Sequence, residues 1–328
     1  RFLEENPNTI VVKQTARVYE KKLIRAKYWI TNYRVPDHVW PQKDQVYVQC
    51  WHGTPLKRLG YDLETSENAI DSIADIRKKY AMDAEKFNYI LSPSGFASEK
   101  FISAWNLKET KMEDKVMEIG YPRNDILFRD NNEEAIKRHK KMLGLPTDKK
   151  IILYAPTWRD DEFSEDDKYE FRPKISFEKL QEELGDEYIM IVKYHYLIMD
   201  AVDWTPYEGF VYHFDQSRDI AELFLVADLL VTDYSSVMFD YSILKRPMFF
   251  FAYDFYKYKN ELRGFYFSYR KEMPGPISST TEELIRDIRE YDGSLYEERY
   301  ENFCRRYNGV DDGSASGQVA TLMDLLIP

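Results

Sequence analysis

Cysteine is scarce in this sequence, and a long apolar run is missing altogether. Only Cys50 and Cys304 occur among 328 residues, which excludes a disulfide framework and a cysteine-based zinc cluster. No run of 18 apolar residues is present, so we expect no segment that spans a bilayer. No signal peptide is visible, although the chain opens on Arg1 rather than on methionine. These absences favour a soluble, cytoplasmic protein, and the opening residue suggests a piece of a longer chain.

Lysine and arginine are also outnumbered by aspartate and glutamate, 46 to 57. The formal net charge of −11 argues against a nucleic-acid-binding protein that relies on a general basic field, although a local basic patch for an anionic ligand or lipid stays compatible with it. Neither a Gly-x-Ser-x-Gly elbow nor a Gly-Lys-Ser/Thr P-loop occurs, so a serine hydrolase and a P-loop enzyme have no support. The hydrophobic content of 44% fits a folded globular protein, and the length allows two domains.

Short apolar runs alternate with helical stretches along the chain. In the first half we expect strands at residues 28–31, 45–50, 87–91 and 116–119, and a weaker one at 10–12. In the second half we expect them at 151–155, 188–193, 210–214, 229–232 and 248–251. This α/β alternation favours a parallel sheet in each half. We divide the chain into an N-terminal domain (1–128), a C-terminal domain (129–295) and C-terminal helices (296–328) that could pack back across the interdomain cleft.

The stretch at residues 227–252 reads as strand, tight turn, helix and strand. Ser235 and Ser236 precede an amphipathic segment, and a serine oxygen suits a helix start because it accepts from the free amide groups of the first turn. Pro247 ends the helix. Such a turn directs backbone N–H groups and the positive end of a helix to one point, where a phosphate can bind. An ordinary strand–helix junction with a capping serine explains the pattern equally well.

Polar residues follow the carboxyl ends of most predicted strands. They are His52, Ser94, Arg123, Thr157, His195, Asp219 and Ser235. In open α/β sheets these strand ends line the ligand crevice. Two such sheets that face each other would bring both sets of loops to one cleft, so we expect the site between the two halves.

Five ordered motifs support a family resemblance that covers roughly residues 28–269. They are Trp51-His52-Gly53-Thr54-Pro55, Gly120-Tyr121-Pro122-Arg123-Asn124-Asp125, Tyr154-Ala155-Pro156-Thr157-Trp158-Arg159, Lys193-Tyr194-His195 and Thr232-Asp233-Tyr234-Ser235-Ser236. Together they resemble the CDP-glycerol glycerophosphotransferase family, the teichoic-acid primases and polymerases of Gram-positive cell walls. The resemblance implies a GT-B-type fold of two Rossmann-like domains with the active site between them. It also implies a peripheral enzyme at the cytoplasmic face of the membrane, acting on a lipid-linked acceptor. Residues 1–125 supply fewer strands than such an N-terminal domain normally has, so we expect that domain to be incomplete.

The reaction that the resemblance implies is attack of an acceptor hydroxyl on the β-phosphorus of CDP-glycerol, with CMP as the leaving group. His52 is our candidate general base, because an imidazole titrates near working pH and this one follows a strand at the cleft. The alternative is a structural histidine beside Trp51. His195 is assigned to the pyrophosphate as a hydrogen-bond donor to the leaving CMP, and a second acid–base role stays open.

The remaining site residues are assigned by the charge or hydroxyl that they offer. Pyrophosphate ligands are expected to be Thr232, Ser235, Ser236, Arg159 and Lys193. The transferred phosphate or glycerol is expected at Arg123 and Asn124, with Asp233 orienting its loop or meeting a donor hydroxyl. Arg218 and Asp219 are expected to border the cytosine. No metal or cofactor is demanded, and His38, His139 and His213 are discounted as ligands, His139 as a solvated side chain.

Other functions stay open at this point. The donor could be CDP-ribitol, another polyol nucleotide or a sugar nucleotide, because two-domain folds carry many chemistries. A non-catalytic module that binds a nucleotide or phospholipid is a different class, and a hydrolase has less support. Membrane contact is expected through Lys57, Arg58 and the basic segment 17–27, although such patches often cover ordinary surface. The sequence leaves undecided the oligomeric state and the choice between primase and polymerase.

Overall fold

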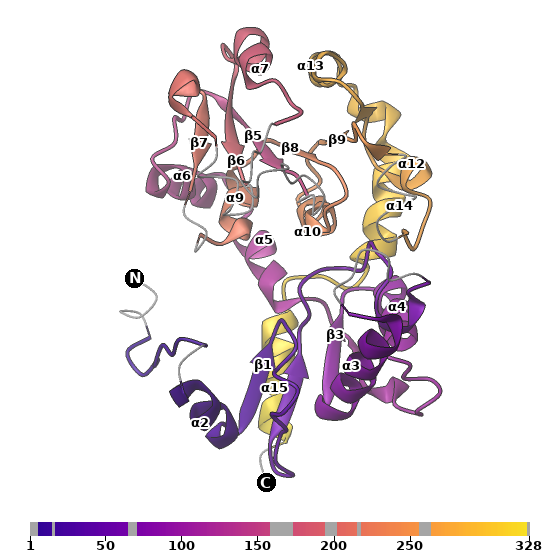
Figure 1. Cartoon of the computed structure of the whole chain (residues 1–328). Coiled ribbons are helices and arrows are strands. Elements are labelled where there is room, and N and C mark those ends of the chain that lie inside the picture. The colour runs from indigo at the N-terminus through magenta and orange to yellow at the C-terminus, as the bar shows by residue number, and fades with distance from the viewer. Residues whose placement is uncertain are drawn as a thin grey trace, which may run out of the picture.

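The computed structural model describes residues 6–14, 17–64, 71–157, 173–193, 202–214, 218–255 and 264–326. Two parallel sheets with covering helices form its upper and lower halves (Figure 1). The two-sheet α/β architecture expected from the sequence is therefore present. No helix in these ranges has both the length and the apolar character needed to cross a membrane.

The first sheet has the order β1-β2-β3-β4, and all of its strands are parallel. These strands are β1 (Tyr28–Thr31), β2 (Val46–Gln49), β3 (Tyr89–Ser92) and β4 (Val116–Glu118). The helices of this half are α2 (Arg17–Arg25), α3 (Ile73–Lys86) and α4 (Gly95–Ala104), with short 3₁₀ turns at Gly60–Asp62 and Glu113–Lys115. An aromatic core that includes Trp29, Tyr47 and Trp105 lies between α3, α4 and the sheet.

The prediction of a weak strand at residues 10–12 is wrong. This segment pairs with no strand of the part that the structure describes. Ile10 is 69% exposed and Val11 is 72% exposed, so neither side chain gains the burial that stabilises a strand.

The second sheet has the order β10-β9-β8-β5-β6-β7 and is also parallel throughout. Its strands are β5 (Lys150–Ala155), β6 (Tyr188–Val192), β7 (Val211–His213), β8 (Leu229–Thr232), β9 (Met248–Phe251) and β10 (Ile277–Ser278). Its helices are α5 (Asp125–Arg129), α6 (Glu133–Met142), α7 (Phe177–Leu184), α9 (Ile220–Val226), α10 (Val237–Ser242), α12 (Tyr269–Glu272) and α13 (Thr281–Arg289). Further 3₁₀ turns occur at Pro122–Asn124, Thr205–Tyr207 and Gly293–Leu295. The strand order reverses between β5 and β8, which is where an α/β sheet of this kind binds its ligand.

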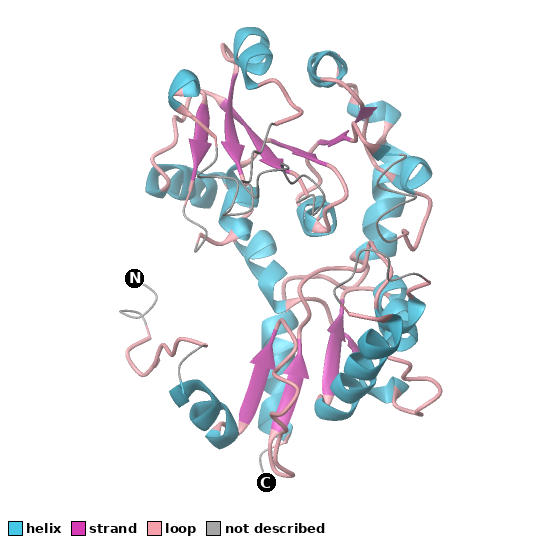
Figure 2. Ribbon diagram, viewed as in Figure 1, coloured by secondary structure: helices cyan, strands magenta, loops and turns pink. Residues whose placement is uncertain are grey.

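The carboxyl ends of the two sheets face each other. In Figure 2 the arrows of the lower sheet point up, and those of the upper sheet point down toward them. The loops that follow the strands therefore lie between the halves.

The C-terminal helices connect the second half back to the first. In α14 (Glu297–Tyr307), Phe303 stacks on Phe239 of α10 at 5.5 Å between ring centroids. In α15 (Ala315–Leu325), Val319 is buried against Val48 and Leu91 of the first sheet. Figure 1 shows α15 beside β1, far from the second sheet in which the preceding strands lie. The domain boundaries given above stay a prediction.

Candidate active site between the two sheets

A cavity of ≈ 430 Å³ lies between the facing strand ends. The first half lines it with residues 51–57 and Leu59, which follow β2. The second half contributes Ala155 at the end of β5 with 156–157 after it, Lys193 after β6, Ile220 of α9 and 234–237 after β8. Both sets of loops thus reach one cavity, as the strand order predicts.

His52 has a defined tautomer in this cavity. Its Nδ1 lies 3.0 Å from the carbonyl oxygen of Asn32. Because a carbonyl only accepts, Nδ1 must carry the proton, and in the neutral ring Nε2 keeps a free lone pair. Burial is the largest influence on the pKa of His52 and lowers it; the hydrogen bond to Asn32 acts in the opposite direction, the positive charge of Arg123 lowers the pKa further, and the pKa lies below its ordinary value. The ring is therefore held in the neutral form that a general base requires.

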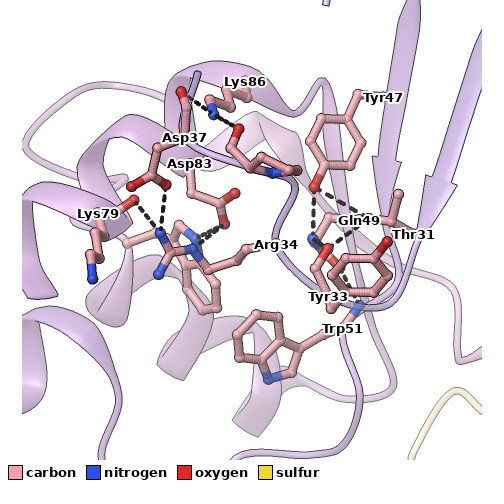
Figure 3. Close-up of polar contacts among 12 residues, drawn as sticks. Thr31, Tyr33, Arg34, Asp37, Tyr47, Gln49, Trp51, Lys79, Asp83 and Lys86 are labelled. Atoms are coloured by element: carbon pink, nitrogen blue, oxygen red, sulfur yellow. Dashed lines mark hydrogen bonds and ion pairs between the residues drawn. The ribbon is translucent and has the colours of Figure 1, made fainter. Parts of the chain in front are cut away.

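A buried amide network fixes the loop that carries His52 (Figure 3). The Oε1 atom of Gln49 accepts from the backbone N–H of Trp51 at 2.9 Å. The Nε2 atom of Gln49 donates to the hydroxyl of Tyr47 at 2.9 Å and to the carbonyl of Tyr33 at 3.1 Å. Trp51 has a φ of +50°, which costs free energy in a residue with a large side chain, and its ring packs 4.1 Å from the ring of His52. Sequence reasoning missed Gln49, and an amide at the end of an apolar strand is the signal that could have found it.

The two halves touch at Gly53 and Ser236. A Cβ atom on Gly53 would lie 2.6 Å from Oγ of Ser236, closer than such atoms approach. Glycine therefore permits the loop after β2 to reach the loop after β8. The structure brings together His52, Ser235, Ser236 and Lys193 around the cavity, while the chemical roles assigned to them stay predictions.

Thr232, the last residue of β8, and Asp233, which follows it, hold the loops rather than line the cavity. The hydroxyl of Thr232 is fully buried and donates to the carbonyl of Ala155 at 2.7 Å. Oδ1 of Asp233 accepts from the backbone N–H of Thr157 at 2.7 Å and of Tyr234 at 2.6 Å. These bonds tie the loop after β5 to the loop after β8. The structure does not support Thr232 as a pyrophosphate ligand, and for Asp233 it favours the loop-orienting role.

Arg123 and Asn124 point to protein partners instead of a ligand. Nε and Nη2 of Arg123 donate to the two carboxylate oxygens of Asp240, at 2.9 and 3.0 Å. Nδ2 of Asn124 donates to Asp240 and to Asp311, at 3.2 Å each. Neither Arg123 nor Asn124 lines the cavity. The donors that these side chains direct at Asp240 and Asp311 are engaged across the two halves, which favours a structural role, and their assignment to the transferred phosphate or glycerol stays a prediction.

Asp311 should make the stability of the fold depend on pH. Burial is the main cause that raises its pKa to about 7 from the ordinary 3.8, and the charge of Asp240 adds to it. The folded chain keeps this proton between about pH 4 and pH 7, whereas the unfolded chain loses it, so the free energy of unfolding falls as pH rises through that window. Across this window the Asp311 proton changes the free energy of unfolding by about 2–4 kcal/mol. We expect Asp311→Asn to remove this pH dependence. Denaturant titrations of both proteins at several pH values measure it, and parallel pH curves would contradict the expectation.

Arg218 and Asp219 also have structural partners. Asp219 caps α9, its carboxylate accepting from the N–H of Ala221 at 2.9 Å. Arg218 pairs with Glu222 at 3.1 Å, one helical turn away. Their side chains do not line the cavity, whereas the adjacent Ile220 does. The expectation that both border the cytosine is not supported by this geometry.

Arg159 and His195 lie outside the described residues, so their assignments stay predictions. His139, expected to be solvated, is 5% exposed and bonds through Nε2 to Asp130 at 3.1 Å. That expectation is wrong, because α6 turns this face toward the protein. Within the described part of the chain, no three His, Cys, Asp or Glu side chains form a group that could hold a metal ion.

Comparison with known proteins places the chain in a family. The family model described as CDP-Glycerol:Poly(glycerophosphate) glycerophosphotransferase matches residues 3–324. The chain is 41% identical over 315 residues to a teichoic acid poly(glycerol phosphate) polymerase of Staphylococcus epidermidis, which covers 95% of this chain and 43% of that protein. It is 39% identical over 298 residues to a teichoic acid glycerol-phosphate transferase of Staphylococcus aureus, which covers 90% of this chain and 75% of that one.

A solved structure extends the likeness to three dimensions. The wall teichoic acid polymerase TagF, in a histidine variant soaked with CDPG, matches with a TM-score of 0.88 and 39% identity, over 96% of this chain and 76% of that one. This match confirms the expected GT-B-type fold. The chain spans less than half the length of the Staphylococcus epidermidis polymerase. The resemblance that the five motifs suggested is confirmed: the chain belongs to the CDP-glycerol:poly(glycerophosphate) glycerophosphotransferase family.

Proposed function

We propose that the chain transfers glycerol phosphate from CDP-glycerol to a hydroxyl of a lipid-linked wall teichoic acid acceptor and releases CMP. The observation that carries this proposal is the cavity in which His52 of one half meets Ser235 and Ser236 of the other. Family membership and the CDPG-soaked TagF structure support the donor.

In the proposed reaction, Nε2 of His52 takes the proton of the acceptor hydroxyl as the oxygen attacks the β-phosphorus. A P–O bond forms to the acceptor, and the bond to the bridging oxygen of CMP breaks, so that CMP leaves with the electron pair. Phosphoryl transfer asks the protein chiefly for positioning and charge stabilisation. Lys193 and the hydroxyl groups of Ser235 and Ser236 line the cavity. In this proposal they bind the diphosphate and stabilise its negative charge. His195 and Arg159 keep their predicted places beside it.

Labelled donors separate this function from its alternatives. The protein is incubated with CDP-glycerol or CDP-ribitol, each labelled in the polyol, together with a lipid-linked acceptor. We expect label from CDP-glycerol in the acceptor and an equal amount of CMP. Label from CDP-ribitol would change the donor, and free glycerol phosphate without acceptor would indicate a hydrolase. Donor binding without CMP release would indicate a non-catalytic module.

The pH dependence of the rate tests the base. Because burial lowers the pKa of His52 below 6.5, the ring is neutral at pH 7. We expect kcat/KM to rise with pH through a value below 6.5 and to be level near neutrality. Rates measured between about pH 5 and pH 8 show this limb, and a limb centred above 6.5 would contradict the assignment.

We also propose that the enzyme lies at the cytoplasmic face of the membrane and contacts it through α2. Val18 and Ile24 of this helix are 45% and 46% exposed beside Lys22 and Arg25. Of the two other basic candidates, Lys57 lines the cavity and Arg58 pairs with Glu64, which makes both weaker membrane contacts. Sedimentation with anionic liposomes should carry the protein down at low salt, and failure to bind at any salt concentration would refute the contact.

A further inference from the structure

Charged and amide side chains from three distant segments form a cluster between the two halves. Arg123 and Asn124 bond to Asp240 as described above. Asp311 accepts from the backbone N–H of Tyr121 at 2.8 Å and from Asn124. The guanidinium of Arg123 lies 3.8 Å from the centroid of the Tyr121 ring, which is fully buried. The donors of Arg123 that face Asp240 form a bidentate fork, the strongest and most directional form of such a pair.

The cluster connects directly to the cavity through α10. That helix begins at Val237, immediately after Ser235 and Ser236, so Asp240 lies one helical turn from the serines. Arg123 belongs to the segment after β4 of the first sheet, whose β2 carries the His52 loop. The pair therefore joins the serine loop of one half to the sheet that holds His52.

The segment between α14 and α15, together with the first turn of α15, fits closely against the cluster. Gly120 has a φ of +86°, and a Cβ atom there would lie 2.6 Å from Oδ1 of Asp311. The carboxylate of Asp125 accepts from the N–H groups of Ala315 and Ser316, at 3.1 and 2.7 Å. These contacts hold residues 120–125 in addition to the bonds with Asp240 of α10, so that Arg123 has little freedom to follow a moving partner.

We propose that Arg123 and Asp240 are positioning residues that clamp α10 to the first sheet and thereby fix the distance between His52 and the Ser235–Ser236 loop. The inference rests on the proposed function, because it assigns the clamp to that same site. Neither side chain lines the cavity, so the clamp acts through the loop and the imidazole. A base displaced by about 1 Å loses much of its rate advantage, whereas donor contacts within the second half survive.

Kinetics of Arg123→Gln and Asp240→Asn test the clamp. We expect kcat to fall by about 10–100-fold in each variant while KM for CDP-glycerol stays within about twofold. The double variant should be no slower than the worse single variant, because the pair acts as a unit. Arg289→Gln is the matched control, since it breaks an exposed ion pair between Arg289 of α13 and Glu183 of α7, and its kinetics should equal those of the parent.

Small-angle X-ray scattering gives a readout that does not need turnover. Release of the clamp should raise the radius of gyration of Arg123→Gln and Asp240→Asn but not of Arg289→Gln. If Asp240→Asn fails to fold, Arg123→Lys replaces it, since lysine keeps the charge and loses the fork.

An unchanged kcat would overturn the proposal. A raised KM with unchanged kcat would also overturn it, because that result makes Arg123 a donor ligand. An unchanged radius of gyration would also overturn it. A parent protein that transfers nothing would refute the proposed function alone, with scattering still deciding the clamp.

Discussion

Replacement of His52 by alanine is expected to lower kcat by about 10²–10⁴-fold, the range that one general base contributes. The reason is the orientation of the ring: its Nδ1 is held by the carbonyl of Asn32, which leaves Nε2 as the proton acceptor. Donor binding should change little, because the proposed donor ligands Ser235, Ser236 and Lys193 belong to the second half of the chain. CMP release measures the first effect, and calorimetric titration with CDP-glycerol measures the second.

His38→Ala is the control for this experiment. His38 bonds to Glu20 at 2.9 Å, its side chain is 70% exposed, and it does not line the cavity. We expect normal turnover from it. Near-normal turnover of His52→Ala would refute the assignment of His52 as the general base. If donor binding falls together with turnover, the result would favour the alternative reading of His52 as a structural histidine beside Trp51.

The sequence predicts the strands of this fold well because most of them are short, buried apolar runs. Residues 28–31, 229–232 and 248–251 match β1, β8 and β9 at both ends. The helix after β8 ends earlier than expected, at Ser242, since the chain turns at Lys245 with a φ of +53°. Strand β10 has two residues, too few for a periodic signal.

The position of the site is predictable for a similar reason, whereas the direction of each side chain is not. Strand ends converge by topology, so His52 and Ser235 meet as expected. Arg123 also follows a strand, but its partner Asp240 lies 117 residues further along the chain. Asn124 likewise bonds to Asp311 at a separation of 187 residues. No local sequence pattern predicts partners this far apart. A residue that binds a ligand therefore cannot be distinguished from one in a structural ion pair until the packing is known.

Gly53→Ala should give the second large loss, about 10–100-fold in kcat/KM. The added Cβ would lie 2.6 Å from Oγ and 3.1 Å from Cβ of Ser236, so one of the two loops must shift. Overpacking of this kind costs about 1–3 kcal/mol of stability, which leaves a folded protein to assay. Gly317→Ala is the control, because nothing lies within 4 Å of its added Cβ in α15, and we expect unchanged kinetics.

A second-site change shows whether the contact itself causes the loss. Ser236→Ala removes the Oγ atom that Gly53→Ala would meet at 2.6 Å and keeps the Cβ at 3.1 Å. Gly53→Ala should therefore cost less activity in the Ser236→Ala background than in the parent, a coupling that a double-mutant cycle measures directly. Equal losses in both backgrounds would mean that the loops separate during turnover. In that case Gly53 would be needed for the shape of its own loop, and the working enzyme would hold His52 and the serines further apart than they lie in this structure.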